Sequence, residues 1–224
     1  MNQPTTHAPS EMISRQRFVP GYDVLLQMCG QLIAEKAGAS GEILVLGAGG
    51  GLEIEAFAKR AQAWRFLAID PDKAMLDAAR VRANACAATE RVTWIEGLVF
   101  DAPPTQCDAA VCLLTLHFVA DDGQKRATLE AVRARLKPGA PFCLVDLCVD
   151  KEAYDYDLRL ARYQRFAEES GAPPEQASTT TERVRNIINT VSARRDEQLL
   201  EAAGFAAIDL FYAGLSWRGW VATA

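Results

Sequence analysis

The sequence predicts an α/β protein built on a doubly wound, mostly parallel sheet of seven strands, with a helical insert near its end. Three observations support this prediction. Short apolar segments alternate with helical segments from residue 42 to residue 148, a glycine-rich loop follows the first apolar segment, and a hairpin pattern closes the chain. Alternation of this kind indicates parallel strands joined by right-handed crossovers.

Five segments have the composition of buried strands. We expect strands at 42–47, 65–70, 91–96, 108–114 and 141–148. A continuous apolar run such as Ile43 to Leu46 is typical of a strand covered on both faces. Residues 205–212 and 215–222 are two further candidates joined by a tight turn, which indicates an antiparallel hairpin at the edge of the sheet.

The helical segments are expected at 11–37 with a break at Pro20-Gly21, and at 52–61, 72–87, 122–136 and 196–203. Residues 151–190 contain no strand candidate and form the insert. Its tyrosines and arginines indicate either a lid that doubles as a dimer surface or an amphipathic helix with a solvated basic stripe. We therefore expect a mobile tail over 1–15 and a single domain over 16–224.

The composition excludes several classes of protein. The net charge of −5 provides no overall basic field for nucleic acid. No apolar run approaches the roughly 20 residues that cross a membrane, and the N-terminus has no signal pattern. The six cysteines form no CxxC pair. We interpret them as small apolar residues in a reducing, cytoplasmic compartment, and we expect no metal site.

The glycine loop, residues 47–51, lies between an apolar strand and a helix, which is typical of nucleotide binding. A Walker loop is excluded, because no Lys-Ser or Lys-Thr follows the glycines. The spacing GxGxG of Gly47, Gly49 and Gly51 departs from the dinucleotide pattern GxGxxG. Asp70 ends the second strand, where a carboxylate either accepts hydrogen bonds from ribose hydroxyls or caps the next helix.

Five segments occur in the order found in class I S-adenosylmethionine-dependent methyltransferases: LVLGAGGG, LAIDPDKAML, VTWIEGL, AAVCLLTLHFV and LKPGAPFCLVD. The chain resembles this family over residues 42–148, and the terminal hairpin resembles its reversed last strand. The motif RFVPGYD and the long helical stretch before EAAGF are similar to the carboxy-S-adenosylmethionine synthase branch, which acts in tRNA modification. The resemblance implies a Rossmann-like fold and S-adenosylmethionine as cofactor.

Carried over residue by residue, the resemblance implies a set of cofactor-binding positions. The glycines let the ligand approach the backbone, and Asp70 holds the ribose. The full set is Tyr22, Gly47, Ala48, Gly49, Gly51, Asp70, Pro71, Met75, Gly97, Leu98 and Leu113.

Four positions depart from the family pattern. The acid that helps to hold the ligand's amino group is Val45 here, and the acid that meets the adenine amine is Leu98. The positions that match the synthase branch's asparagine and arginine are Leu113 and Leu199. Neither leucine pairs with a carboxylate, although Arg194 and Arg195 lie nearby in sequence. We therefore do not expect the chain to make carboxy-S-adenosylmethionine.

His117 follows the fourth strand at the carboxyl edge, where ligands bind to such sheets. It is either a general base or a wall of the adenosine site. We expect a methyltransferase acting on a small-molecule acceptor, with a homodimer as its assembly and no nucleic acid or membrane partner. The alternatives are a carboxy-S-adenosylmethionine synthase-like enzyme and a ligand-binding relative without turnover, since the acids missing at Val45 and Leu98 favour a loss of activity.

Overall fold

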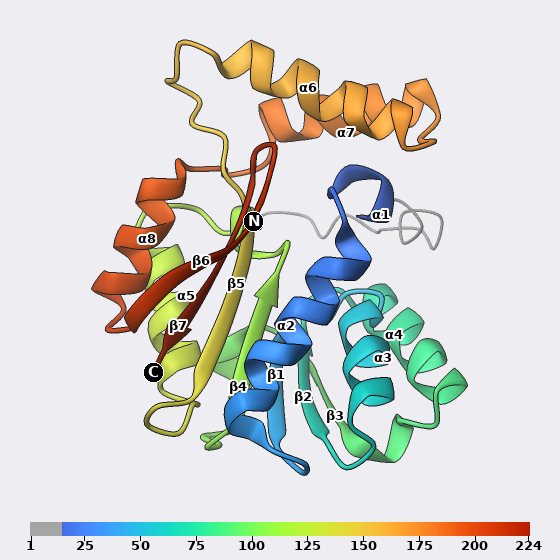
Figure 1. Ribbon diagram of the computed structural model, residues 1–224, viewed down its shortest axis with the longest axis vertical. Helices are drawn as coiled ribbons and strands as arrows, with labels where there is room; N and C mark the ends of the chain where they lie inside the picture. The colour runs from blue at the N-terminus through green and yellow to red at the C-terminus, as the bar shows by residue number, and fades with distance from the viewer. Residues whose placement is uncertain (1–14) are drawn as a thin grey trace.

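The computed structural model describes residues 15–224 and contains a seven-stranded sheet with the order β3-β2-β1-β4-β5-β7-β6 (Figure 1). The strands are β1 (Glu42–Leu46), β2 (Arg65–Asp70), β3 (Val92–Glu96), β4 (Ala109–Leu113), β5 (Pro141–Leu147), β6 (Ala206–Gly214) and β7 (Trp217–Thr223). The first five strands are parallel, and β7 pairs antiparallel with both β5 and β6. The predicted fold class, with its reversed last strand, is confirmed.

Eight helices surround this sheet in the described residues. They are α1 (Arg15–Phe18), α2 (Tyr22–Ala37), α3 (Leu52–Arg60), α4 (Lys73–Ala85), α5 (Gln124–Arg133), α6 (Tyr156–Glu169), α7 (Pro174–Asn186) and α8 (Ala193–Ala202). The break at Pro20-Gly21 separates α1 from α2, as expected. The first part of the expected tail, residues 1–14, lies outside the described residues, while Arg15 begins α1.

Two apolar cores lie on opposite faces of the sheet, and alternate residues of each strand supply them. Ile43 and Val45 of β1 join the core beneath α2, α3 and α4, whereas Leu44 and Leu46 join the core beneath α5 and α8. This arrangement explains why β1 is apolar at four consecutive positions. Trp217 and Trp220 of β7 likewise join different cores.

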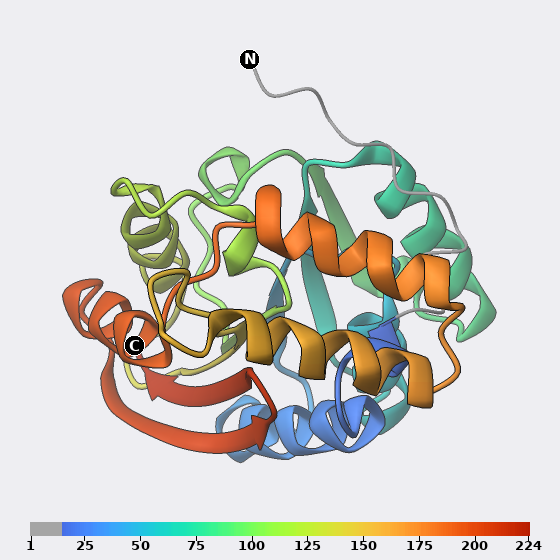
Figure 2. The same ribbon diagram turned by 90° about the horizontal axis from the view of Figure 1, so that it is seen from above.

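The insert forms a cover rather than a continuation of the sheet. Residues 151–190 contain α6 and α7, which lie side by side above the carboxyl edge of the sheet (Figure 2). Gly171, with a left-handed φ of 88°, and Pro173-Pro174 end one helix and begin the next. Tyr163 and Val184 bury their side chains against the core that contains α2. The cover is therefore packed onto the domain by apolar contacts.

The strand order reverses between β1 and β4, which are neighbours although they are separated in sequence. In open α/β sheets, ligands bind beyond the carboxyl ends of the strands at this switch point. The glycine loop follows β1 there, and the 3-10 turn η4 (Leu116–Phe118) follows β4. The fold thus places the two most distinctive sequence motifs next to each other.

Candidate active site

The glycine loop is held tightly by its neighbours. The N–H groups of Gly47 and Ala48 both donate to the carbonyl oxygen of Ile69, at 2.9 and 3.0 Å. Gly47 has φ of 74°, and a Cβ atom there would lie 2.0 Å from Oγ1 of Thr115. Only glycine allows this approach, because a side chain would be strained and would also collide with Thr115. The loop after β1 and the turn after β4 are therefore in direct contact.

Asp70 lies at the end of β2, 9% exposed, and holds the backbone of both the glycine loop and the segment after β2. Its Oδ2 accepts a hydrogen bond from the N–H of Gly49 at 2.8 Å, and its Oδ1 accepts one from the N–H of Asp72 at 2.9 Å. Burial raises the pKa of Asp70, while these two hydrogen bonds act in the opposite direction. A carboxylate offers about four lone-pair positions, so acceptors remain for further donors.

The helix cap that competed with the ribose role belongs to another residue. Asp72 is the N-cap of α4, and its side chain accepts hydrogen bonds from the N–H groups of Ala74 and Met75 at 2.8 and 3.3 Å. Asp70 is therefore not the cap of α4, and its carboxylate binds the backbone of the glycine loop.

The expected adenine side is formed by the segment after β3. The N–H of Gly97 donates to the carbonyl oxygen of Asp70 at 3.1 Å, which brings Gly97 and Leu98 beside the end of β2. The Leu98 side chain is 54% exposed, whereas its N–H donates to Oδ2 of Asp101 at 2.8 Å. Of the other expected positions, Pro71 is exposed, Met75 is partly buried, and Leu113 is buried in the core.

A charged cluster at the start of α3 was missed by the sequence reasoning. Glu53 is 1% exposed, and its Oε1 accepts hydrogen bonds from the hydroxyl of Tyr22 at 2.9 Å and from Nη1 of Arg15 at 3.2 Å. Burial and the Glu53 charge raise the pKa of Tyr22 well above its ordinary value, so the hydroxyl keeps its proton and donates. Tyr22, an expected site residue, is thus hydrogen-bonded through Glu53 to the first turn of α3, which follows the glycine loop.

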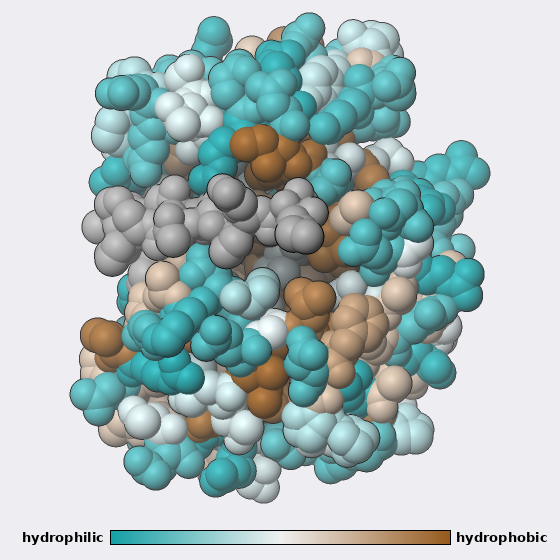
Figure 3. Space-filling view, turned by 180° about the vertical axis from the view of Figure 1, so that it is seen from behind, coloured by the Kyte–Doolittle hydropathy of each residue, from teal (hydrophilic) through white to brown (hydrophobic). Residues whose placement is uncertain are grey.

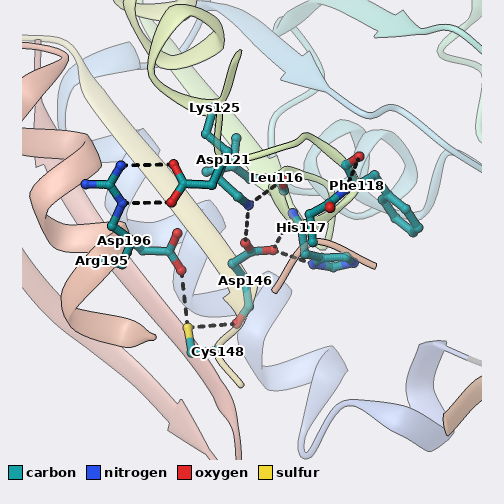
Figure 4. Close-up of polar contacts among 10 residues, drawn as sticks. Leu116, His117, Phe118, Asp121, Lys125, Asp146, Cys148, Arg195 and Asp196 are labelled. Atoms are coloured by element: carbon teal, nitrogen blue, oxygen red, sulfur yellow. Dashed lines mark hydrogen bonds and ion pairs between the residues drawn. The ribbon is translucent and has the colours of Figure 1, made fainter. Parts of the chain in front are cut away.

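His117 is buried in η4 and hydrogen-bonded to Asp146 of β5, a second residue that the sequence reasoning missed (Figure 4). Oδ1 of Asp146 contacts Nδ1 of His117 and also accepts from the His117 backbone N–H at 3.1 Å. An ionised carboxylate only accepts, so the proton of the neutral imidazole lies on Nδ1 and Nε2 is left as the basic nitrogen. The signal for Asp146 was present, because it is the one acid inside the apolar strand FCLVDLC.

Lys125 and two aromatic rings pack around the His117–Asp146 pair. Nζ of Lys125 donates to the carbonyl oxygen of Leu116 at 2.8 Å and lies 3.8 Å from Oδ2 of Asp146. This buried cation offsets part of the cost of burying the Asp146 carboxylate. The rings of Phe118 and Trp217 lie 4.6 and 5.9 Å from the imidazole, between centroids. The imidazole is therefore fixed in position by polar and aromatic contacts.

Asp196 of α8 lies beyond Asp146, and Cys148 donates to its Oδ2 at 3.4 Å. Burial and the neighbouring charge of Asp146 raise the pKa of Asp196 well above its ordinary value. Asp196 therefore keeps its proton to a higher pH than an ordinary aspartate does.

Three further features bear on the sequence expectations. Within residues 15–224, no cluster of three or more His, Cys, Asp or Glu side chains is arranged to bind a metal ion. All six cysteines are free, and five of them are buried. No helix among the described residues has the length and apolar character needed to span a membrane.

Comparisons with known proteins relate this chain to methyltransferases and to carboxy-S-adenosyl-L-methionine synthases. A methyltransferase domain family matches residues 44–142. Carboxy-S-adenosyl-L-methionine synthases from Vibrio cholerae and Klebsiella pneumoniae are 23% and 25% identical over 199 residues, which cover 88% of this chain and 80% of each relative.

Among solved structures, an O-methyltransferase described as putative from Nostoc punctiforme has a TM-score of 0.67 at 18% identity. An O-methyltransferase family protein from Burkholderia thailandensis has a TM-score of 0.63 at 17% identity. The matches cover 92% and 90% of this chain but only 57% and 56% of the solved chains. This chain thus spans a little over half the length of each of those solved chains.

Proposed function

We propose that this chain, a class I S-adenosylmethionine-dependent methyltransferase, methylates a hydroxyl group of a small molecule, with His117 as the general base. The observation that carries the proposal is the hydrogen bond between His117 and Asp146, which occupies Nδ1 and leaves Nε2 as the basic nitrogen of an imidazole in the turn after β4. The contact between Thr115 and Gly47 ties this turn to the glycine loop.

The described residues fit the donor. The Cβ position of Gly47 faces Thr115 and that of Gly49 faces Arg15, so these glycines allow neighbouring side chains to pack against the loop. Asp70 keeps acceptor positions for ribose hydroxyls, and Glu53 has one buried oxygen without a hydrogen bond among the described residues. When bound, S-adenosylmethionine supplies a methyl group on a positively charged sulfur. The glycine loop and Asp70 then contribute by orientation, which accounts for up to ~7–11 kcal/mol when reacting groups are well placed.

His117 contributes by proton transfer. Its Nε2 accepts the proton of the acceptor hydroxyl as the oxygen becomes nucleophilic, and Asp146 stabilises the imidazolium that forms. General base catalysis of this kind accelerates reactions roughly 10²–10⁴-fold. A thiol ionises at a lower pH than a phenol and has less need of such a base, so the base favours a hydroxyl over a thiol acceptor.

The surroundings of His117 favour an acceptor with an apolar body. The N–H of Asn189 donates to the carbonyl oxygen of His117 at 2.8 Å, so the segment after α7 is joined to η4. Phe118 and Ile187 lie on the two sides of this junction and are 53% and 63% exposed. Seen from behind, apolar side chains gather just below the helical cover (Figure 3). A phenol or a comparable apolar alcohol matches these features.

The net charge and the cover support a small acceptor over a large nucleic acid, as the sequence predicts. We include in the proposal a cytoplasmic location and a homodimer formed through the cover, where Tyr154 and Leu158 are 101% and 51% exposed. Light scattering with size-exclusion chromatography tests the dimer, and filter binding with total tRNA at physiological salt tests the partner. Retention of tRNA that weakens with added salt would contradict a small acceptor.

The decisive experiment combines labelled donor with a panel of phenols and a small-molecule extract. Wild-type protein is expected to transfer label, whereas His117→Gln is expected to lose about 10²–10⁴-fold in kcat. S-adenosylhomocysteine should bind equally to both proteins, because no hydrogen bond joins His117 to the glycine loop within residues 15–224. Equal kcat values for wild type and His117→Gln would refute the base. Absence of transfer to any acceptor would favour the ligand-binding relative without turnover.

The carboxy-S-adenosylmethionine synthase alternative is favoured by the names of the relatives, but the charged groups do not fit it. Leu199 is 2% exposed and packs into the core beneath α5 and α8. Arg195 donates from Nε and Nη2 to the Asp121 carboxylate at 2.8 and 3.0 Å, so its charge is already paired. Arg194 is exposed at the start of α8. Neither Arg194 nor Arg195 therefore replaces the arginine with which the synthase branch is expected to hold the extra carboxylate.

A further inference from the structure

We propose that Arg15 and Glu53 bind the amino-acid end of S-adenosylmethionine, with the guanidinium on the α-carboxylate and the Glu53 carboxylate on the α-ammonium. This inference rests on the proposed function for the identity of the ligand. It assigns a role to two residues that replace the acid expected at Val45, which is 1% exposed and packs in the core.

Glu53 is a buried carboxylate that is only half satisfied. Its Oε1 accepts two hydrogen bonds, whereas Oε2 is buried and has no hydrogen-bond partner among the described residues. A buried anionic oxygen without a donor is costly, because it has lost its water and gained nothing in return. An ammonium group supplies three donors and a positive charge, so it satisfies this oxygen.

Arg15 lies over the glycine loop, on the path that a ligand bound to Asp70 would follow. A Cβ atom built on Gly49 would lie 2.3 Å from Nη2 of Arg15, so the guanidinium rests directly on that glycine. The N–H of the same glycine donates to Asp70. Burial would lower the pKa of Arg15, but the neighbouring charges of Glu53 and Asp70 raise it above its ordinary value. The guanidinium is therefore charged, and its planar fork suits a carboxylate.

Hydrogen bonds to the terminal hairpin hold the backbone that follows Arg15 in place. Nε1 of Trp217 donates to the carbonyl oxygen of Phe18 at 3.0 Å, and the hydroxyl of Tyr212 donates to that of Pro20 at 2.7 Å. Both bonds join the chain around α1 to the terminal hairpin. The Arg15 side chain is 21% exposed, so it is not fully enclosed by the protein.

The Arg15–Glu53 pair presents one positive and one negative charge beside the glycine loop. A zwitterionic amino acid beside the Arg15–Glu53 pair places its carboxylate against the cation and its ammonium against the free Glu53 oxygen. The competing interpretation is a structural latch, in which the pair only attaches α1 to α3. A latch affects every ligand of the cleft equally, whereas a zwitterion site affects only ligands that carry the amino acid.

Calorimetric titrations with two ligands separate these interpretations. S-adenosylhomocysteine carries both the nucleoside and the amino acid, whereas 5′-methylthioadenosine carries the nucleoside alone. We expect Arg15→Met and Glu53→Gln each to weaken S-adenosylhomocysteine binding about 10–100-fold and to change methylthioadenosine binding less than about twofold. Arg15→Lys should recover part of the loss. Arg17→Met removes the same charge from the same helix and should leave both ligands unaffected.

Two results would overturn the inference while the proposed function stands. One is unchanged S-adenosylhomocysteine binding in both variants, and the other is an equal loss for the two ligands, which is the result of a latch or of a folding defect. Failure of the wild-type protein to bind S-adenosylhomocysteine would instead overturn the proposed function and this inference together. Retained methylthioadenosine binding in Glu53→Gln shows that the variant is folded.

Discussion

Replacing Asp70 with asparagine tests the link between the second strand and the glycine loop. Each carboxylate oxygen accepts one backbone hydrogen bond, from Gly49 and from Asp72. Asparagine keeps the shape but has a single acceptor oxygen, so its NH2 group must face one of these two N–H donors. At least one hydrogen bond to a charged acceptor is lost, which corresponds to about 1.5–3 kcal/mol in the free energy of unfolding.

Ligand binding should suffer by a comparable amount, because a neutral amide also replaces the charged acceptor for the ribose. A loss of 1.5–3 kcal/mol corresponds to a dissociation constant that is roughly 10–150-fold weaker. Burial raises the pKa of Asp70, so urea unfolding and S-adenosylhomocysteine titration are best done at pH 8, where the carboxylate is charged. Asp72→Asn is the matched control, since asparagine caps a helix as well as aspartate does. Equal behaviour of the two variants would refute the reasoning.

Three further predictions concern stability and specificity. Gly47→Ala should destabilise more than Gly139→Ala in urea unfolding, because both have φ near 75° but only Gly47 faces Thr115, and equal losses would contradict the contact. The pKa of Asp196 is raised in the folded protein, so folding becomes less favourable as the pH rises above the ordinary pKa of an aspartate, because the buried side chain must stay protonated or be buried with a charge. Asp196→Asn should therefore raise the melting temperature more at pH 8 than at pH 5, and a pH-independent effect would count against a buried neutral acid. Mass spectrometry of wild-type protein incubated with S-adenosylmethionine and prephenate should reveal no carboxylated donor; a clear product peak would show that another cation holds the carboxylate.

Much of the fold follows from local patterns in the sequence. The strand β1 was predictable because a strand buried on both faces is apolar at nearly every position. The loop that follows was predictable because Gly47, Gly49 and Gly51 adopt positive φ angles, which favour glycine. Asp70 was predictable from its place at the end of a strand. The turn η4 was not expected, since Leu114 adopts a left-handed φ of 55° that no propensity indicates for leucine.

The partners of the site residues required the tertiary structure. An acid in the first turn of an amphipathic helix is usually solvated, and Glu53 is buried only because the segment that carries Arg15 and Tyr22 folds over it. Asp146 and His117 are 29 residues apart, and their contact depends on β4 and β5 being neighbours. The sequence alone left His117 as either a wall or a base, and the hydrogen bond to Asp146 now favours the base.

The central claim is that the carboxyl edge of the sheet binds S-adenosylmethionine through the glycine loop and Asp70, and one calorimetric comparison tests it most directly. Wild-type protein at pH 8 is titrated with S-adenosylhomocysteine and, separately, with NAD. The account predicts saturable binding of one S-adenosylhomocysteine per chain, weakened in Asp70→Asn, and no heat of binding with NAD. Saturable binding of NAD without any binding of S-adenosylhomocysteine would contradict it.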